Sequence, residues 1–151
     1  MRTFTDLADL VAAKGEHLGY SGWHTVTQES IDTFADATGD HQWIHVDRDK
    51  AAAGPFGGTI AHGFLTLSLL SAFSPQVWRL EKQPTMTINY GLNRVRFLQP
   101  VRSGARVRDG VELTDVRETK SGTLLTFQHT VEIEGEERNA LAAEGLSLVV
   151  P

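Results

Sequence analysis

The sequence contains no cysteine and has no excess of positive charge, and each absence excludes a class of protein. Without cysteine, the chain forms no disulfides, thiolate nucleophiles or cysteine-ligated metal sites. A formal net charge of −5 disfavours nucleic acid or an anionic membrane as the main partner. A length of 151 residues fits a single domain with a proper core, and we place no boundary between residues 1 and 151.

A long apolar run is also missing. The apolar-rich stretch at 64–73 is interrupted by Thr and Ser and is too short to span a bilayer. Acidic Asp6 falls where a signal peptide would have its apolar region. We therefore expect a soluble, cytoplasmic protein that binds neither nucleic acid nor membrane.

The first half of the chain shows apolar patterns typical of helices. Residues 6–14 and 28–38 carry apolar side chains at helical spacing, with Thr5 as the expected cap of the first helix and Gly39 as the end of the second. Residues 40–59 are irregular, with one helical turn predicted near 47–53. A stretch that begins at residue 62 is apolar on most sides, which indicates a buried helix.

After residue 84 the apolar period becomes two, which is typical of strands. Apolar residues fall on even positions from 86 to 92 and on odd positions at 95 and 97, so a β-bulge is predicted beside Gly91. Further strands are predicted near 107–113, 125–133 and 146–150, with a hairpin turn at Gly135. Helices followed by strands indicate an α+β fold, in which a curved antiparallel sheet would cover the apolar helix.

Asp40 and His45 lie five residues apart in the irregular segment that follows the second helix. An acid and a base on one loop can share a water molecule, which is what hydration of a double bond needs. Three alternatives remain for these residues: Asp40 as an ordinary turn residue, His45 as a structural histidine, and a metal site made of His41, His45 and Asp47.

A second candidate segment leads from Gly57 and Gly58 into the apolar helix. The first N–H groups of a helix have no partner inside it, so the Gly63 N–H could stabilise an oxyanion. His129 keeps phase with its apolar neighbours on a predicted strand, which favours a core or interface role over a catalytic one.

Three segments, taken in order, resemble the signature of MaoC-like (R)-specific enoyl-CoA hydratases. They are Thr38-Gly39-Asp40, Ile44-His45-Val46-Asp47 and Ile60-Ala61-His62-Gly63-Phe64. The stretch 90–104 is also similar to the strand after the central helix of that family. The resemblance covers most of the chain from about residue 28, whereas residues 1–27 resemble an N-terminal extension with the first strand region. It departs at Gln42-Trp43, where the family has Asn-Pro.

The resemblance implies a single hot-dog fold, with a long central helix from His62 to roughly Leu80 and a homodimer whose sheets join edge to edge. It assigns Asp40 and His45 as the catalytic dyad and the Gly63 N–H as the oxyanion donor. Ser71 matches a serine near the active site in the family. Further candidates for substrate binding are Gln42 and His62.

The implied reaction is the reversible hydration of trans-2-enoyl-CoA to (R)-3-hydroxyacyl-CoA in fatty acid metabolism. The acyl group would be carried by coenzyme A or acyl-carrier protein, and we expect no metal or redox cofactor. Candidates for contacts with the coenzyme A phosphates are Arg94, Arg96, Arg102 and Arg106. Two alternatives stay open: a hot-dog acyl-CoA thioesterase and a non-catalytic acyl-thioester-binding protein.

Overall fold

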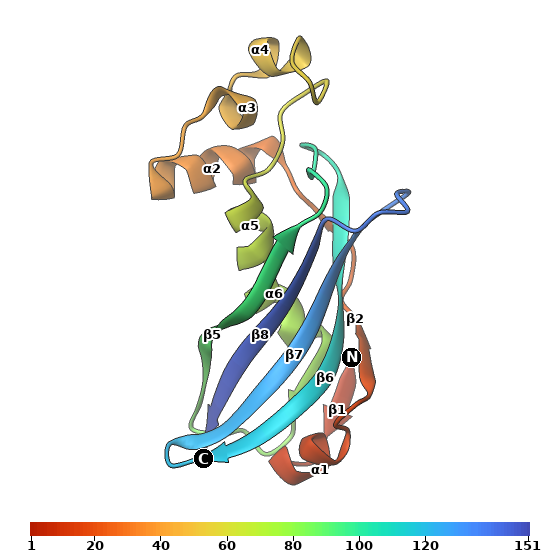
Figure 1. The fold of residues 1–151 in the computed structure, drawn as a ribbon, viewed down its shortest axis with the longest axis vertical. Coiled ribbons are helices and arrows are strands. Elements are labelled where there is room, and N and C mark those ends of the chain that lie inside the picture. The colour runs from red at the N-terminus through yellow and green to blue at the C-terminus, as the bar shows by residue number, and fades with distance from the viewer.

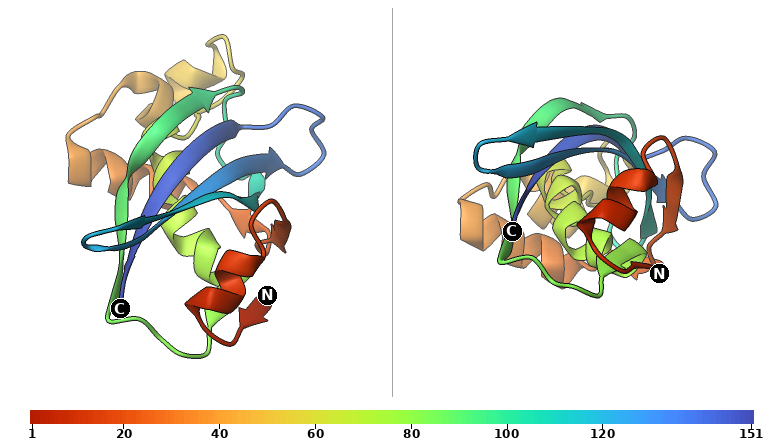
Figure 2. Two further views of the ribbon diagram at one scale, coloured as in Figure 1. Left: turned by 60° about the horizontal axis from the view of Figure 1, so that its bottom comes forward. Right: turned by 90° about the horizontal axis from the view of Figure 1, so that it is seen from below.

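The computed structural model describes residues 1–151 and is built around one strongly curved antiparallel sheet of six strands. The strand order is β2-β6-β7-β8-β5, and β3 also pairs with β6. The strands are β2 (His17–Tyr20), β3 (His24–Thr25), β5 (Met86–Phe97), β6 (Arg106–Thr119), β7 (Gly122–Ile133) and β8 (Leu141–Val150). The sheet curves over two consecutive helices, α5 (Gly63–Ser68) and α6 (Leu70–Val77) (Figure 2).

The other helices lie at the two ends of the sheet. At one end stand α2 (Gln28–Thr38), α3 (Trp43–Val46) and α4 (Arg48–Ala52), beyond the ends of the strands (Figure 1). At the other end lie β1 (Arg2–Phe4) and α1 (Leu7–Ala12). The α+β class and the helix-in-sheet arrangement predicted from the sequence are confirmed. No helix is both long and apolar enough to cross a membrane.

The central helix is shorter than predicted. It consists of α5 (Gly63–Ser68) and α6 (Leu70–Val77), which meet at Leu69. The prediction that it continues to Leu80 is wrong, because residues 78–80 form strand β4 (Trp78–Leu80), which pairs in parallel with β1. This pairing satisfies backbone groups that a longer helix would have satisfied by itself.

Of three further local predictions, a bulge and a turn are confirmed and a helix cap is wrong. The bulge beside Gly91 is confirmed, since the pairing of β5 with β8 shifts register between Asn89 and Gly91 and again after Leu92. The turn at Gly135, with φ 80°, is confirmed as well. Thr5 is not the cap of α1: the Asp6 side chain accepts the Asp9 N–H at 3.0 Å instead.

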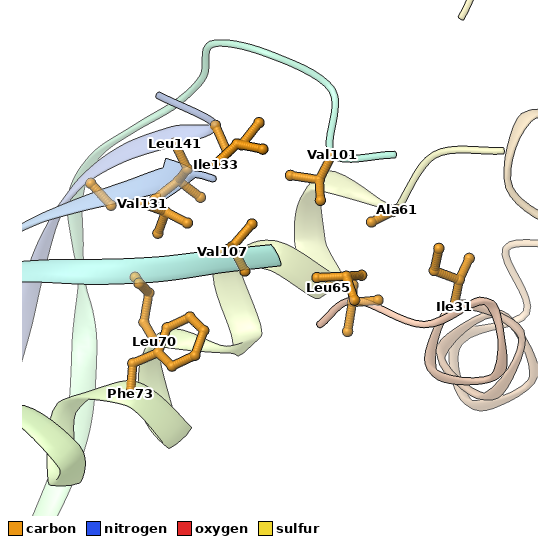
Figure 3. Packing of buried hydrophobic residues seen from close by; sticks show 13 residues of the cluster. Ile31, Ala61, Leu65, Leu70, Phe73, Val101, Val107, Val131, Ile133 and Leu141 are labelled. Carbon is orange, nitrogen blue, oxygen red and sulfur yellow. The ribbon is translucent and has the colours of Figure 1, made fainter. Parts of the chain in front are cut away.

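The core beneath the sheet consists of two apolar clusters. The first cluster joins α2, α5 and α6 to the strands and includes Ile31, Leu65, Phe73, Val107 and Leu141 (Figure 3). The second lies toward α1 and includes Phe4, Leu10, Val77, Leu113 and Leu125. Two polar side chains, Asp109 on β6 and His129 on β7, are buried on the same strands as both clusters.

Candidate active site

Asp40 lies at the point where α2 ends. Gly39 adopts the left-handed conformation, with φ 79°, and its N–H donates to the Ala35 carbonyl at 2.8 Å. The Asp40 carboxylate is exposed and accepts the Gln42 N–H at 3.3 Å, which closes a tight turn. Its backbone carbonyl accepts from His62 Nε2 at 2.9 Å, so the loop is fixed to the start of α5.

His45 lies on the short helix α3 and is buried, with only 6% of its surface exposed. Its Nδ1 lies 2.7 Å from the Ile60 carbonyl oxygen. Because a carbonyl can only accept, Nδ1 carries the hydrogen, and Nε2 is left with a free lone pair. The fold therefore presents His45 as a base through Nε2.

The environment of His45 keeps this base uncharged. Burial lowers the pKa of the imidazole below its ordinary value of 6.5, and the bond to the Ile60 carbonyl offsets only part of that effect. The neighbouring His62 lowers the pKa of His45 further, whereas Asp40 raises it. A neutral imidazole at physiological pH can accept a proton from water.

His62 completes a group of three side chains. Its ring stacks on His45 with centroids 3.8 Å apart, and its Nδ1 is buried without a hydrogen-bond partner. One ligand atom from each of Asp40, His45 and His62 lies within 4.8 Å of the others. This set of two imidazoles and a carboxylate fits a small polar occupant, either a water molecule or a divalent cation.

The alternative metal site considered from spacing does not form. His41 is exposed and its Nε2 pairs with Asp36 Oδ1 at 2.8 Å, whereas Asp47 caps α4 by accepting the Lys50 N–H at 2.9 Å. Neither side chain joins His45. His41 and His45 are four residues apart in sequence. The irregular loop nevertheless turns their side chains toward different partners.

Gly63 is the first residue of α5, directly after His62. It lines a cavity of about 250 Å³ together with His45 and Thr66. A Cβ at this position would lie 3.1 Å from the Phe97 ring, so the absence of a side chain also has a packing reason. The N–H of Gly63 has no partner inside the helix, and Gly63 lines the same cavity as His45.

Gln28 and Thr59, which the sequence did not single out, hold in place the loop that carries Asp40 and His45. Gln28 Nε2 donates to the His45 carbonyl and to Asp32 Oδ1, both at 2.8 Å. Its Oε1 accepts from the buried Thr59 hydroxyl. Gln28 thus connects α2, α3 and the segment before α5. These contacts join positions 17 and 31 residues apart, so no local pattern could have revealed them.

The remaining predicted residues lie outside this group. Ser71 is on α6, accepts from Asn89 Nδ2 at 3.1 Å and lines a second, larger cavity. Gln42 is exposed and meets Asp40 through its backbone, while its side chain does not cap α3. Of the four arginine candidates, Arg106 is paired with Glu134 at 2.9 Å. Arg96 donates to the Val95 carbonyl.

Comparison with known proteins shows the family of this chain. Residues 9–134 match the family model described as the MaoC like domain. The chain is 54% identical over 147 residues to the 3-hydroxyacyl-thioester dehydratase Z of Mycobacterium tuberculosis, covering 97% of both. It is 50% identical over 145 residues to nodulation protein N of Rhizobium leguminosarum bv. viciae, covering 95% of this chain and 90% of that protein.

A solved structure supports the fold independently. The (R)-hydratase from A. caviae involved in PHA biosynthesis has a TM-score of 0.72 and 25% identity, covering 89% of this chain and 96% of its own. The fold is therefore the hot-dog fold that the sequence resemblance implied, with the sheet wrapped around α5 and α6. This chain belongs to the MaoC-like dehydratase family.

Proposed function

We propose that this protein reversibly hydrates a trans-2-enoyl thioester to an (R)-3-hydroxyacyl thioester. The observation that carries the proposal is the hydrogen bond from His45 Nδ1 to the Ile60 carbonyl, which leaves Nε2 as a free acceptor beside Asp40. The names of a relative, a 3-hydroxyacyl-thioester dehydratase, and of a structural neighbour, an (R)-hydratase, support the same reaction class.

The geometry supports a mechanism in which His45 moves the proton. A water molecule between Asp40 and His45 gives one proton to His45 Nε2 while its oxygen forms the bond to C3. The C2–C3 π electrons move toward the thioester carbonyl, whose oxygen accepts from the Gly63 N–H. The imidazolium then returns the proton to C2, so the elements of one water molecule are added and the enzyme is regenerated. Asp40, as a carboxylate, orients the water and stabilises the imidazolium.

We propose that neither metal nor redox cofactor takes part, with coenzyme A or acyl-carrier protein entering only as the carrier of the acyl group. Transfer of the proton through His45 balances the reaction without a Lewis acid. The Asp40, His45 and His62 group could hold a cation, so dialysis against a chelator tests this point. Unchanged turnover after chelation is expected, and loss that zinc or magnesium restores would contradict it.

We also propose that the working form is a homodimer. β5 is an edge strand of the sheet and is exposed along nearly its whole length. Large apolar side chains stand on and beside it, with Tyr90 exposed to 63% and Phe64 to 68%. A second copy paired along this edge would cover both the apolar surface and the open strand edge.

The decisive experiment follows the enoyl-thioester absorbance of crotonyl-CoA and of a longer enoyl-CoA, with free thiol measured in parallel. Wild type should consume the enoyl band without releasing thiol. Asp40→Asn and His45→Gln should each lower kcat/KM by about 10²- to 10⁴-fold, because each removes one partner of the reacting water. His41→Gln, which changes an exposed histidine outside the group, is the matched control and should keep activity.

Other outcomes of this experiment identify the alternatives. Release of thiol from the acyl thioester would indicate a thioesterase. Binding of enoyl-CoA without turnover at any chain length would indicate a binding protein. Either result would overturn the proposed hydration.

A further inference from the structure

The larger cavity, of about 660 Å³, lies between the central helices and strands β5, β7 and β8. Its wall is apolar over most of its area but also carries several polar side chains. Side chains with hydroxyl or amide groups come from both layers: Ser68, Ser71 and Ser74 from the helices, Asn89 and Ser147 from the strands. A mostly apolar pocket with a few polar groups is the usual form of a ligand site, in which the polar groups fix the orientation of the ligand.

His129 also lines this cavity, and it is held by a buried carboxylate. His129 Nδ1 lies 2.7 Å from Asp109 Oδ2, with 6% of His129 and none of Asp109 exposed. Because a carboxylate accepts, Nδ1 carries the hydrogen. No hydrogen bond engages Nε2, so this nitrogen is left for an occupant of the cavity.

The pair is costly at this place in the core. It is flanked along the same strands by buried Val107, Val111, Phe127 and Val131. Burial raises the pKa of the Asp109 carboxyl, and the bond from His129 offsets only part of that rise. Asp109 Oδ1 has no hydrogen-bond partner. An apolar pair would pack here at lower cost, so stability alone does not account for these residues.

Two further residues shape the wall of the cavity. Gly145 lines the cavity beside the imidazole, and a Cβ there would lie 3.3 Å from His129 Nε2. Trp78 lines the cavity as well, stacks on Phe127, and has a buried indole Nε1 with no partner. The cavity thus contains a free imidazole nitrogen, whereas the unpaired indole N–H of Trp78 is buried and not open to it.

We propose that His129 is a specificity-determining residue that hydrogen-bonds an oxygen substituent on the acyl chain of the substrate. The substrate class is an acyl thioester that carries a hydroxyl or carbonyl group away from the thioester. Asp109 is a positioning residue, since it acts through His129 by fixing the ring and the hydrogen on Nδ1. This inference rests on the proposed function: Phe64, the residue after Gly63, lines this cavity, and we take the cavity to hold the acyl part of the thioester.

Binding of unreactive ligands tests the inference without requiring turnover. Saturated acyl-CoAs of several chain lengths would be titrated calorimetrically. At each length, the unsubstituted (plain) acyl-CoA is compared with acyl-CoAs that carry a hydroxyl group at different carbons. For at least one matched pair, wild type should bind the hydroxylated member on the order of tenfold tighter, because the plain chain leaves the buried polar atoms unpaired. His129→Leu should reduce this preference to within about twofold while retaining affinity for plain chains.

Two further variants separate a specific role from packing. Asp109→Asn keeps the shape of the side chain but replaces the charged acceptor of the His129 Nδ1–H with a neutral amide, which weakens the bond that orients the ring and should reduce the preference. Leu146→Ala removes volume from the same wall without a polar group, and should change the affinities of both members of a pair alike. Asp109→Asn should melt as wild type does, which would show that this variant is folded. The preference can then be measured in it even where His129→Leu does not fold.

The outcomes distinguish the inference from the proposed function. Equal binding of all pairs by wild type, or a preference that survives in both His129→Leu and Asp109→Asn, would overturn the inference even where crotonyl-CoA is hydrated. A preference that depends on His129 in a protein without hydratase activity would overturn the proposed function and leave the inference standing. Failure of wild type to bind any acyl-CoA would overturn both.

Discussion

At the residue scale, the proposed chemistry depends on which ring nitrogen of each histidine carries its hydrogen. His45 donates through Nδ1 to the Ile60 carbonyl, whereas His62 donates through Nε2 to the Asp40 carbonyl. The stacked rings therefore offer opposite nitrogens, Nε2 of His45 and Nδ1 of His62, as acceptors. Backbone carbonyls, which do not titrate, fix both tautomers, so the arrangement does not depend on pH as long as both rings stay neutral.

The lowered pKa of His45 predicts the pH dependence of activity. Protonation of Nε2 removes the base, so kcat/KM should fall with decreasing pH along a limb whose midpoint lies below the ordinary imidazole value of 6.5. The pH profile of kcat/KM on crotonyl-CoA measures this midpoint. A midpoint above 6.5 would contradict the burial argument.

The same shift has a consequence for stability. The unfolded chain binds a proton at His45 near pH 6.5, whereas the folded chain does so only at lower pH. The free energy of unfolding contributed by this residue therefore decreases as pH falls through that window and is unaffected above it. Denaturant unfolding at several pH values should show that the free energy of unfolding decreases less below pH 6.5 in His45→Gln than in wild type.

At the element scale, Gln28 of α2 holds the loop that carries Asp40 and His45. Replacing this residue by leucine leaves the His45 carbonyl and the Thr59 hydroxyl without their partner. Gln28→Leu should lower stability by about 1–2 kcal/mol. It should also lower kcat by roughly 10- to 100-fold with little change in KM, because the base shifts without loss of substrate contacts.

Steady-state kinetics together with denaturant unfolding check this expectation. Glu29→Gln, at the next and exposed position of α2, is the matched control and should leave both quantities unchanged. A rise in KM at constant kcat for Gln28→Leu would show that the glutamine acts on substrate binding instead.

The sequence predicted those elements whose signals are local. The stop at Gly39 and the bulge beside Gly91 were visible because one residue or one change of period specifies each. The end of the central helix was not visible, since β1, more than seventy residues earlier in the sequence, pairs with residues 78–80. The stacking of His62 on His45 and the bond from His129 to Asp109 likewise bring together residues distant in sequence.

At the scale of the whole molecule, the exposed edge at β5 predicts association. Ile88→Lys places a charge on this strand, which a second copy paired along β5 would have to desolvate. Sedimentation equilibrium should show a dimer for wild type and a shift toward monomer for the variant. Ser121→Lys, in the exposed turn between β6 and β7, adds the same charge elsewhere and should remain dimeric. A monomeric wild type would contradict the proposed assembly.

The division of the core into two apolar clusters bears on how the molecule opens transiently. β6 and β7 contribute side chains to both clusters, whereas α2 contributes only to the first and α1 only to the second. Local opening of one cluster then leaves the other intact, so amide protons in α1 and in α2 should exchange with solvent in separate events. The central strands should exchange only on complete unfolding. We therefore expect the N-terminal region to detach and rebind on its own timescale without disturbing the loop that holds Asp40 and His45.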